Sequence, residues 1–194
     1  MASLRGKPVL CAMLVGLSLM LALPAGASAG ARGCRGADAR PGEVSTSTLR
    51  AATRCLINRE RRRRGIRRLR SNRRLARAAR RHAADMVRRG YVSHFSRPGT
   101  TFVRRWGRDV VDRIRSTGYL RGARSWTVGE NLGAGAGRDS TPRATVRYWM
   151  GSRSHRGEIL ARRYRHIGVG VVRGSPYRWV EAATYVTDFG VVRR

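Results

Sequence analysis

The chain has 194 residues, of which 41% are hydrophobic, and its formal net charge at pH 7 is +31. This length favours one domain of ordinary size, and the apolar content excludes a disordered polyelectrolyte in spite of the charge. Glycine has no regular period, no heptad pattern persists and only one long apolar run occurs. These features exclude a collagen, a coiled coil and a multi-span membrane protein.

The apolar run lies near the start of the sequence and has the features of a secretory signal peptide. Arg5 and Lys7 precede an uncharged stretch over residues 9–23, and small residues follow as far as Ala29. This arrangement predicts cleavage after Ala29 and secretion of the remainder. A membrane anchor is the alternative, but the run is short for a hydrocarbon core about 30 Å thick. Cleavage would lower the net charge by two, from +31 to +29, because Arg5 and Lys7 lie in the removed segment.

Two cysteines, Cys34 and Cys55, remain after residues 1–29 are removed. In an oxidising exterior they can form a disulfide, which would stabilise the fold by about 2–4 kcal/mol. A free, buried Cys55 with a loose Cys34 is the alternative, and secretion favours the bridge. Residues 30–46 are rich in Gly, Ala, Pro and Arg and predict an irregular arm, followed by one domain over residues 47–194.

Apolar residues at helical spacing open this domain. The first predicted helix covers residues 48–64, with Ser47 as its N-cap and Gly65 at its end. The second begins after Asn72 and ends at Gly90, because Asn is a good N-cap and Gly a common C-cap. The domain therefore starts with two amphipathic helices.

Two further helices are expected in the middle of the chain. The third covers residues 101–117, although Gly107 at its centre weakens the pattern. The fourth is short and begins with Thr141 as N-cap and Pro142 at the first helical position.

The last third of the chain changes to the period of strands. Residues 167–172 and 179–186 are rich in β-branched and aromatic residues, and turn-forming residues 173–177 separate them. This pattern predicts an antiparallel hairpin, and a further strand is expected over residues 126–132. Helices followed by a small antiparallel sheet predict an α+β fold in layers.

Three segments place ionisable residues in settings that composition alone does not predict. His94 follows the glycine that ends the second helix, Glu130 lies inside an apolar strand, and His155 follows the fourth helix. The spacings are 36 residues from His94 to Glu130 and 25 residues from Glu130 to His155. With these segments in this order, the sequence resembles the bacterial secreted branch of the CAP superfamily, also called the SCP-like superfamily.

The resemblance extends over residues 49–189 and implies a three-layer α-β-α sandwich with a small antiparallel sheet flanked by helices. It also implies a ligand cleft shared by His94, Glu130 and His155. Many members place a second Glu in this cleft, but this chain has Ser152 at the matching position. The motifs that match in order are residues 56–61, 79–86, 91–94, 129–131, 149–160 and 167–170.

Two imidazoles and one carboxylate are a reasonable ligand set for Zn²⁺, with water in the open position. On that interpretation His94 and His155 hold the metal, and Ser152 adds no negative charge. The same residues could instead form a hydrogen-bonded pair of histidines held by the carboxylate.

The other histidines and the glycine-rich segment are weaker candidates for a functional site. His82 lies on the apolar stripe of the second helix and is predicted to be a core histidine rather than a ligand. His166 precedes a strand and is expected at the surface. The glycine-rich residues 133–137 lack the Lys-Ser/Thr of a phosphate loop and are predicted to be a flexible connector near the cleft.

Arginine is unusually dense at the start of the domain, where residues 59–81 hold 13 arginines and one acidic residue. Such density is typical of nucleic-acid-binding arms. These arginines alternate with apolar stripes, however, so they are expected on the solvated faces of helices. We therefore favour binding to an anionic cell envelope or extracellular polymers over specific binding to nucleic acid.

Two classes of function remain. One is a secreted module whose cleft binds a small lipid, a metal or a cell-wall fragment, as similar family members are often proposed to do. The other is a metal-assisted hydrolase with Glu130 as general base and His94 and His155 holding Zn²⁺ or polarising a carbonyl. We favour the binding module, because no nucleophile with an activating partner is evident and no common hydrolase motif occurs.

Overall fold

A computed structural model describes residues 33–194, which form one unit. The predicted signal peptide, its cleavage site at Ala29 and the first residues of the predicted arm lie outside the described residues. Within residues 33–194, no helix is both long enough and apolar enough to cross a membrane.

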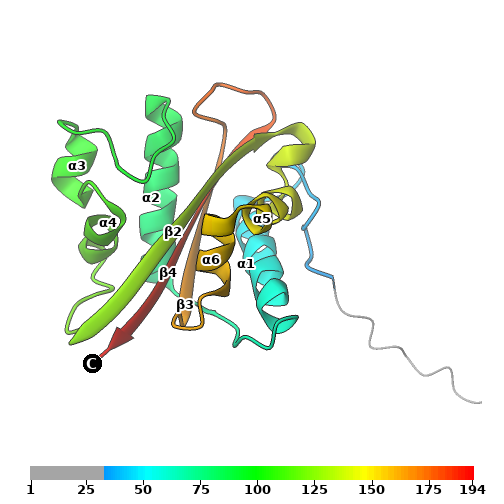
Figure 1. The fold of residues 1–194 in the computed structure, drawn as a ribbon. Coiled ribbons are helices and arrows are strands. Elements are labelled where there is room, and N and C mark those ends of the chain that lie inside the picture. The colour runs from blue at the N-terminus through cyan, green and yellow to red at the C-terminus, as the bar shows by residue number, and fades with distance from the viewer. Residues whose placement is uncertain (1–32) are drawn as a thin grey trace, which may run out of the picture. The chain divides into compact units, whose positions relative to one another are not determined.

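Four strands form one sheet in the order β1-β3-β4-β2 (Figure 1). They are β1 (Arg70–Ser71), β2 (Ser125–Ala136), β3 (His166–Arg173) and β4 (Ala182–Arg193). The strands β3 and β4 form the predicted antiparallel hairpin, β2 pairs antiparallel with β4 along its whole length, and β1 joins β3 in parallel. The long strand β2 therefore lies at one edge of the sheet.

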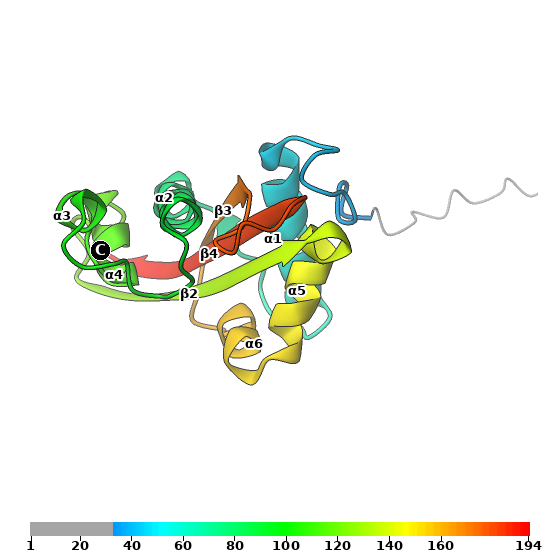
Figure 2. The same ribbon diagram turned by 90° about the horizontal axis from the view of Figure 1, so that it is seen from above.

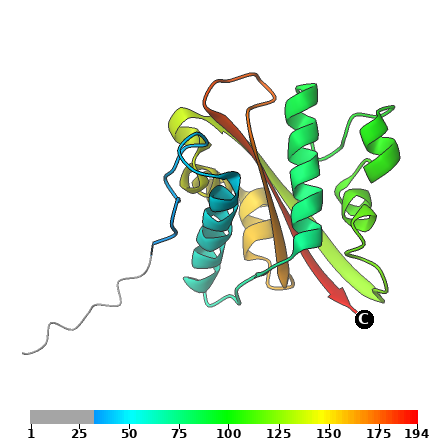
Figure 3. The same cartoon turned by 180° about the vertical axis from the view of Figure 1, so that it is seen from behind.

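Helices cover both faces of this sheet (Figures 2 and 3). On one face, α2 and α4 pack against apolar side chains of β2 and β4. On the other face, α1, α5 and α6 form a second core with β3 and β4. This is the expected α+β, three-layer α-β-α sandwich. The helices are α1 (Thr46–Arg62), α2 (Arg73–Arg89), α3 (Thr101–Trp106), α4 (Val110–Ser116), α5 (Pro142–Gly151), α6 (Arg153–Leu160) and the 3₁₀ helix η1 (Gly137–Ser140).

Local capping explains most helix ends. The side chain of Asn72 accepts backbone N–H groups at the start of α2, and Gly90 ends that helix with φ 64°, as predicted. Thr141 caps α5 in the same manner. At α1 the N-cap is Ser45 rather than the expected Ser47, because the Ser45 side chain accepts the N–H of Thr48.

The prediction of one helix over residues 101–117 is wrong. Gly107 interrupts it with φ 89°, and a Cβ there would lie only 2.0 Å from the Cβ of Asp112. A new helix, α4, then starts with Asp109 as its N-cap, since its side chain accepts the N–H of Asp112 at 2.9 Å.

Two strand boundaries also differ from the prediction. The strand expected over residues 179–186 begins only at Ala182, because the preceding loop turns with positive φ at Arg178 and Glu181. The strand β2 continues to Ala136, so residues 133–136 pair with β4 and are not a flexible connector. The helix α6 and the short strand β1 were not expected from periodicity.

Glycines in β3 let α2 lie directly on the sheet. A Cβ at Gly168 would lie 2.1 Å from the backbone of Leu75 and Ala76, and one at Gly170 would lie 2.3 Å from the backbone of Arg80. Val169, between these glycines, points to the opposite face, because side chains alternate along a strand. The α2 helix therefore holds a fixed position over the sheet.

The predicted disulfide is present. Cys34 and Cys55 are joined, with their Cα atoms 5.7 Å apart, so the segment before α1 is fastened to that helix. The same segment contacts α5, because the N–H of Arg143 donates to the carbonyl of Ala37 at 2.8 Å.

Candidate functional site

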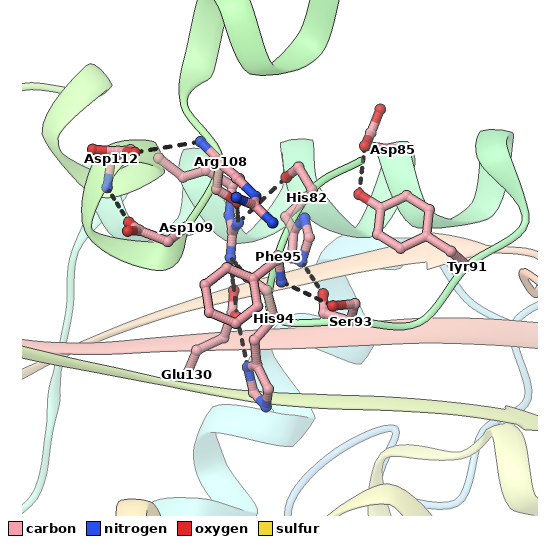
Figure 4. Close-up of polar contacts among 12 residues, drawn as sticks. His82, Asp85, Tyr91, Ser93, His94, Phe95, Arg108, Asp109, Asp112 and Glu130 are labelled. Atoms are coloured by element: carbon pink, nitrogen blue, oxygen red, sulfur yellow. Dashed lines mark hydrogen bonds and ion pairs between the residues drawn. The ribbon is translucent and has the colours of Figure 1, made fainter. Parts of the chain in front are cut away.

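His94 lies in the loop after α2 and reaches the edge strand β2. Its Nδ1 is 2.9 Å from Oε1 of Glu130 (Figure 4). The carboxylate oxygen can only accept, so Nδ1 carries the hydrogen and Nε2 is free to act as an acceptor when the ring is neutral. The His94 side chain is 52% exposed, whereas that of Glu130 is 2% exposed. The buried carboxylate therefore holds an imidazole that solvent can reach.

Arg113, on α4, fixes this carboxylate. Its Nη2 donates to both oxygens of Glu130, at 3.0 and 2.8 Å, and to the carbonyl of His94 at 3.1 Å. Its Nη1 donates to the carbonyl of Arg108 at 2.8 Å. One guanidinium thus ties the β2 carboxylate to the loop that carries the histidine. Sequence reasoning missed Arg113, whose only signal was its place between Val110 and Ile114 on a helix that packs on the sheet.

Asp188 lies opposite Glu130 on β4 and is 1% exposed. Burial raises its pKa well above the usual value, and the charge of Glu130 raises it further, so Asp188 keeps its proton. Burial alone would raise the pKa of Glu130 too, but the hydrogen bond with His94 and the charge of Arg113 lower it. Of these two neighbouring carboxyl groups, Glu130 is therefore the ionised one. Sequence reasoning missed Asp188 because its partner lies on another strand.

His155 approaches the same strand from the other face of the sheet. Its carbonyl accepts a hydrogen bond from Nδ2 of Asn131 at 3.0 Å, and its ring lies 5.6 Å from that of Tyr148. Burial lowers the pKa of His155, and the positive charge of His94 lowers it further. Successive side chains of a strand point to opposite faces. Glu130 therefore contacts His94 on one face and Asn131 contacts His155 on the other, so both histidines lie at the same segment of β2.

The fourth sequence-predicted residue, Ser152, is not part of this cluster. It occupies the N-cap position of α6 without a capping hydrogen bond from its side chain, and its Oγ lies 3.1 Å from Oγ of Ser154. In residues 33–194 it makes no hydrogen bond to the side chains of His94, Glu130 or His155.

A second carboxylate that sequence reasoning missed belongs to Glu158, three residues after His155 on α6. The hydroxyl of Tyr164 donates to its Oε2 at 2.5 Å. A Cβ at Gly129 would lie 1.9 Å from that oxygen, which shows how closely Glu158 packs on β2. Its charge helps to raise the pKa of His94, although the hydrogen bond to Glu130 is the larger cause.

The two remaining histidines lie outside the candidate site. His82 is fully buried in α2, its Nε2 is 2.8 Å from the carbonyl oxygen of Ser93, and burial lowers its pKa to about 4, as expected for a core histidine. His166 begins β3, where its Nδ1 lies 2.9 Å from the hydroxyl of Tyr119.

The residues of the predicted zinc site do not provide a suitable set of metal donors. Both oxygens of Glu130 accept hydrogen bonds from Arg113, and one of them also contacts His94. Across the described part of the chain, no three His, Cys, Asp or Glu side chains are grouped so that they could hold a metal ion. Of the predicted ligands, only the imidazoles of His94 and His155 remain as metal donors, which are too few for the expected zinc site.

Two solved structures share the fold. An extracellular protein of Bacillus anthracis that contains an SCP domain superimposes with a TM-score of 0.56 at 22% identity, over 78% of this chain and 44% of that one. An outer surface protein of Borrelia burgdorferi gives a TM-score of 0.59 at 18% identity, over 77% of this chain and 97% of that one.

Comparison of amino-acid sequences identifies a relative and a family. The protein YkwD of Bacillus subtilis is 33% identical over 121 residues, which are 62% of this chain and 41% of that protein. The chain thus matches less than half of the length of this relative. Residues 55–187 match the cysteine-rich secretory protein (CAP) family. The chain therefore belongs to the CAP family.

Proposed function

We propose that this protein is an extracellular CAP module that binds a small ligand beside β2 through His94 and His155. The observation that carries the proposal is the 2.9 Å contact between Nδ1 of His94 and the buried carboxylate of Glu130. It fixes the ring and its tautomer while half of the side chain stays exposed. An imidazole held in this way is suited to bind a polar group, because its orientation costs nothing further on binding.

The state of His155 supports the same proposal. Its Nδ1 is buried and has no hydrogen-bond partner within residues 33–194. A buried polar atom without a partner costs about 1–3 kcal/mol. A ligand with a hydroxyl, carbonyl or phosphate group could satisfy it, and a small lipid or a cell-wall fragment carries such groups.

The hydrolase alternative has less support. Glu130 is 2% exposed and both of its oxygens accept hydrogen bonds from Arg113, so the carboxylate positions His94 and is poorly placed to activate water. A general base must lie within hydrogen-bond reach of the proton that it removes. Binding without catalysis therefore fits the geometry better.

An extracellular location is supported by three observations. The Cys34–Cys55 disulfide is typical of an oxidising compartment. Two proteins with the same fold are described as an extracellular protein and an outer surface protein. The residues before the described part have the sequence pattern of a signal peptide.

The ligand can be sought in purified, exported protein. Untargeted mass spectrometry should find a small molecule that is retained by the wild type and lost from His94→Ala and His155→Ala. His166→Ala is the matched control, because His166 lies outside the cluster and contacts Tyr119. Calorimetric titration with ZnCl₂ alone on the same proteins separates metal binding from binding of an organic ligand. Equal retention by all four proteins would contradict the proposed site.

A second property that we propose is adhesion to anionic envelope surfaces or extracellular polymers. Ten of the thirteen arginines in residues 59–81 are exposed. Arg61 is an exception, since its guanidinium is buried and donates to the carbonyls of Arg67, Ile159 and Ala161. The remaining charge faces solvent and favours binding that weakens as salt rises.

A further inference from the structure

A pocket of about 870 Å³ lies at the C-terminal end of β2 and is lined by four consecutive residues of that strand. Successive side chains point to opposite faces of a sheet, so a pocket that touches four in a row must meet the edge of the strand. The other residues that line it are Asp139, Ala144, Thr145, Tyr148, Trp179 and Val180.

The backbone of β2 has free hydrogen-bonding groups at this edge. Gly137 donates its N–H to the carbonyl of Glu181, directly across from it, so odd-numbered residues of β2 bond to β4. The N–H and C=O groups of Leu132, Ala134 and Ala136 then point away from the sheet. The carbonyl of Leu132 is taken by the indole of Trp149 at 2.7 Å. Ala136 is the N-cap of η1, so its carbonyl accepts the first hydrogen bond of that helix. The N–H and C=O of Ala134 and the N–H of Ala136 are left at the pocket, which both residues line.

Small residues and exposed apolar side chains shape this edge for an extended chain. Between Gly133 and Ala136 the strand has only Gly and Ala, which allow another backbone to approach closely. Tyr148, Trp179 and Val180 line the pocket and are 62%, 46% and 83% exposed. Together they offer apolar contacts to the side chains of a bound peptide.

The charged residues around this pocket favour some peptides over others. An adjoining pocket shares Asp139 and Ala144 with the first and is lined by Arg138 and Arg147. That pocket is also lined by Arg40 and Asp38, so its three arginines outnumber its two carboxylates, and the whole chain carries +31. The rim therefore favours a ligand with a negative charge.

We propose that residues 133–136 bind a short, extended peptide with apolar side chains and a free carboxylate, which adds to the sheet as a strand beside β2. Four residues of strand span about 13 Å, which suits three or four residues of ligand. Main-chain hydrogen bonds supply affinity in this mode, and apolar pockets supply selectivity. The inference goes beyond the proposed function, because none of its contacts uses His94, Glu130 or His155.

The test is equilibrium dialysis at low salt of the secreted protein against a mixture of acetylated tetrapeptides of Ala, Val and Leu with free carboxyl termini. Mass spectrometry reads which peptides are retained. Retained peptides are then compared with their C-terminal amides and with analogues that are N-methylated at alternate residues. We expect the amides to bind about threefold more weakly and the N-methylated peptides about tenfold more weakly, since the latter lose main-chain hydrogen bonds.

Two variants at one position give a matched protein control. Ala134→Pro removes an N–H that points away from β4, so no ladder bond is lost, and proline is tolerated at edge strands. Ala134→Ser keeps that N–H. We expect about tenfold weaker peptide binding in Ala134→Pro and wild-type binding in Ala134→Ser. If Ala134→Pro does not fold, the N-methylated peptides on the wild type decide the question.

Several results would overturn the inference. They are retention of none of the peptides, equal binding of N-methylated and parent peptides, equal binding by a folded Ala134→Pro, and retention of myristic acid but not of peptides. His94→Ala should bind peptides as the wild type does. Loss of peptide binding in His94→Ala alone would place the ligand in the histidine cluster, which would support the proposed function and contradict this inference.

Discussion

The Nη2 of Arg113 lies 2.8 Å from Oε2 of Glu130, and both side chains are only 2% exposed. Burying two charges is costly, and the pair is held by further hydrogen bonds from Arg113 to the loop that carries His94. Its structural consequence is a fixed carboxylate under an exposed imidazole. The stability of the protein and the geometry of the histidine cluster therefore depend on the same ion pair.

Replacing Arg113 with Met should lower the free energy of unfolding by about 3–5 kcal/mol, because Glu130 stays buried and loses its only buried countercharge among the described residues, while His94 is half exposed. Urea denaturation measures this change. Arg115→Met is the matched control on the same helix, since Arg115 is exposed and pairs with exposed Asp112. The control should change stability by about 0.5 kcal/mol or less. Similar losses in both variants would show that burial of the Arg113–Glu130 pair is not the cause.

The histidines should titrate in a fixed order. The hydrogen bond to Glu130 raises the pKa of His94 above 6.5, burial lowers that of His155 below 6.5, and burial lowers that of His82 to about 4. NMR titration of the imidazole protons measures each value directly. A midpoint for His94 at or below 6.5 would contradict the ion pair with Glu130.

The same shifts set the pH range over which the His94–Glu130 pair stabilises the fold. The folded pKa of His94 is raised, so its contribution is full below 6.5 and is lost as pH rises through the folded value. The folded pKa of Glu130 is lowered, so its contribution is full above 4.5 and is lost as pH falls through the folded value. In His94→Ala, the free energy of unfolding should no longer fall as the pH rises through the folded pKa of His94.

Two glycines should respond to alanine in opposite directions. Gly168→Ala places a Cβ 2.1 Å from the backbone of α2 and should destabilise the fold by about 1–3 kcal/mol or more. Gly157 lies within α6 with nothing near its Cβ position, so Gly157→Ala should stabilise by about 0.5–1 kcal/mol. Thermal denaturation followed by circular dichroism measures both. Equal changes would show that α2 does not rest on β3 as described.

Removal of the disulfide should cost stability without loss of the fold. The double variant Cys34→Ser with Cys55→Ser should unfold about 2–4 kcal/mol more easily, because the bridge restricts the unfolded chain. Intact-mass measurement of the exported wild type should also show an N-terminus at Gly30 and two fewer hydrogens than the dithiol. A full-length product with free thiols would contradict both processing and pairing.

Binding to anionic surfaces should depend strongly on salt. Association with vesicles that contain phosphatidylglycerol should weaken steeply between low and physiological salt, and neutral vesicles should bind little. Replacing exposed Arg67 and Arg68 with Gln should reduce both affinity and its dependence on salt. Sedimentation with vesicles measures this. Binding that is unchanged across salt, or a preference of orders of magnitude for one DNA sequence over random DNA, would exclude surface adhesion.

The sequence by itself determined the features that depend on near neighbours. The caps at Asn72, Gly90 and Thr141 were predicted correctly because a cap bonds to backbone groups two to four residues away. The Cys34–Cys55 bridge and the β3–β4 hairpin followed from composition and short turns. The family resemblance singled out His94, Glu130 and His155, which the structure places along one edge strand.

Only the tertiary structure decided what surrounds these residues, because those contacts join segments far apart in the chain. In the sequence, Arg113 is one of many arginines, and only the packing of α4 brings its side chain to Glu130 on β2. Asp188 lies beside Glu130 because of the register between β2 and β4. Both carboxyl groups are buried, and the contacts of Glu130 with His94 and Arg113 lower its pKa while that of Asp188 stays raised. Burial and strand register are properties of the packed sheet, and no local pattern in the sequence specifies them.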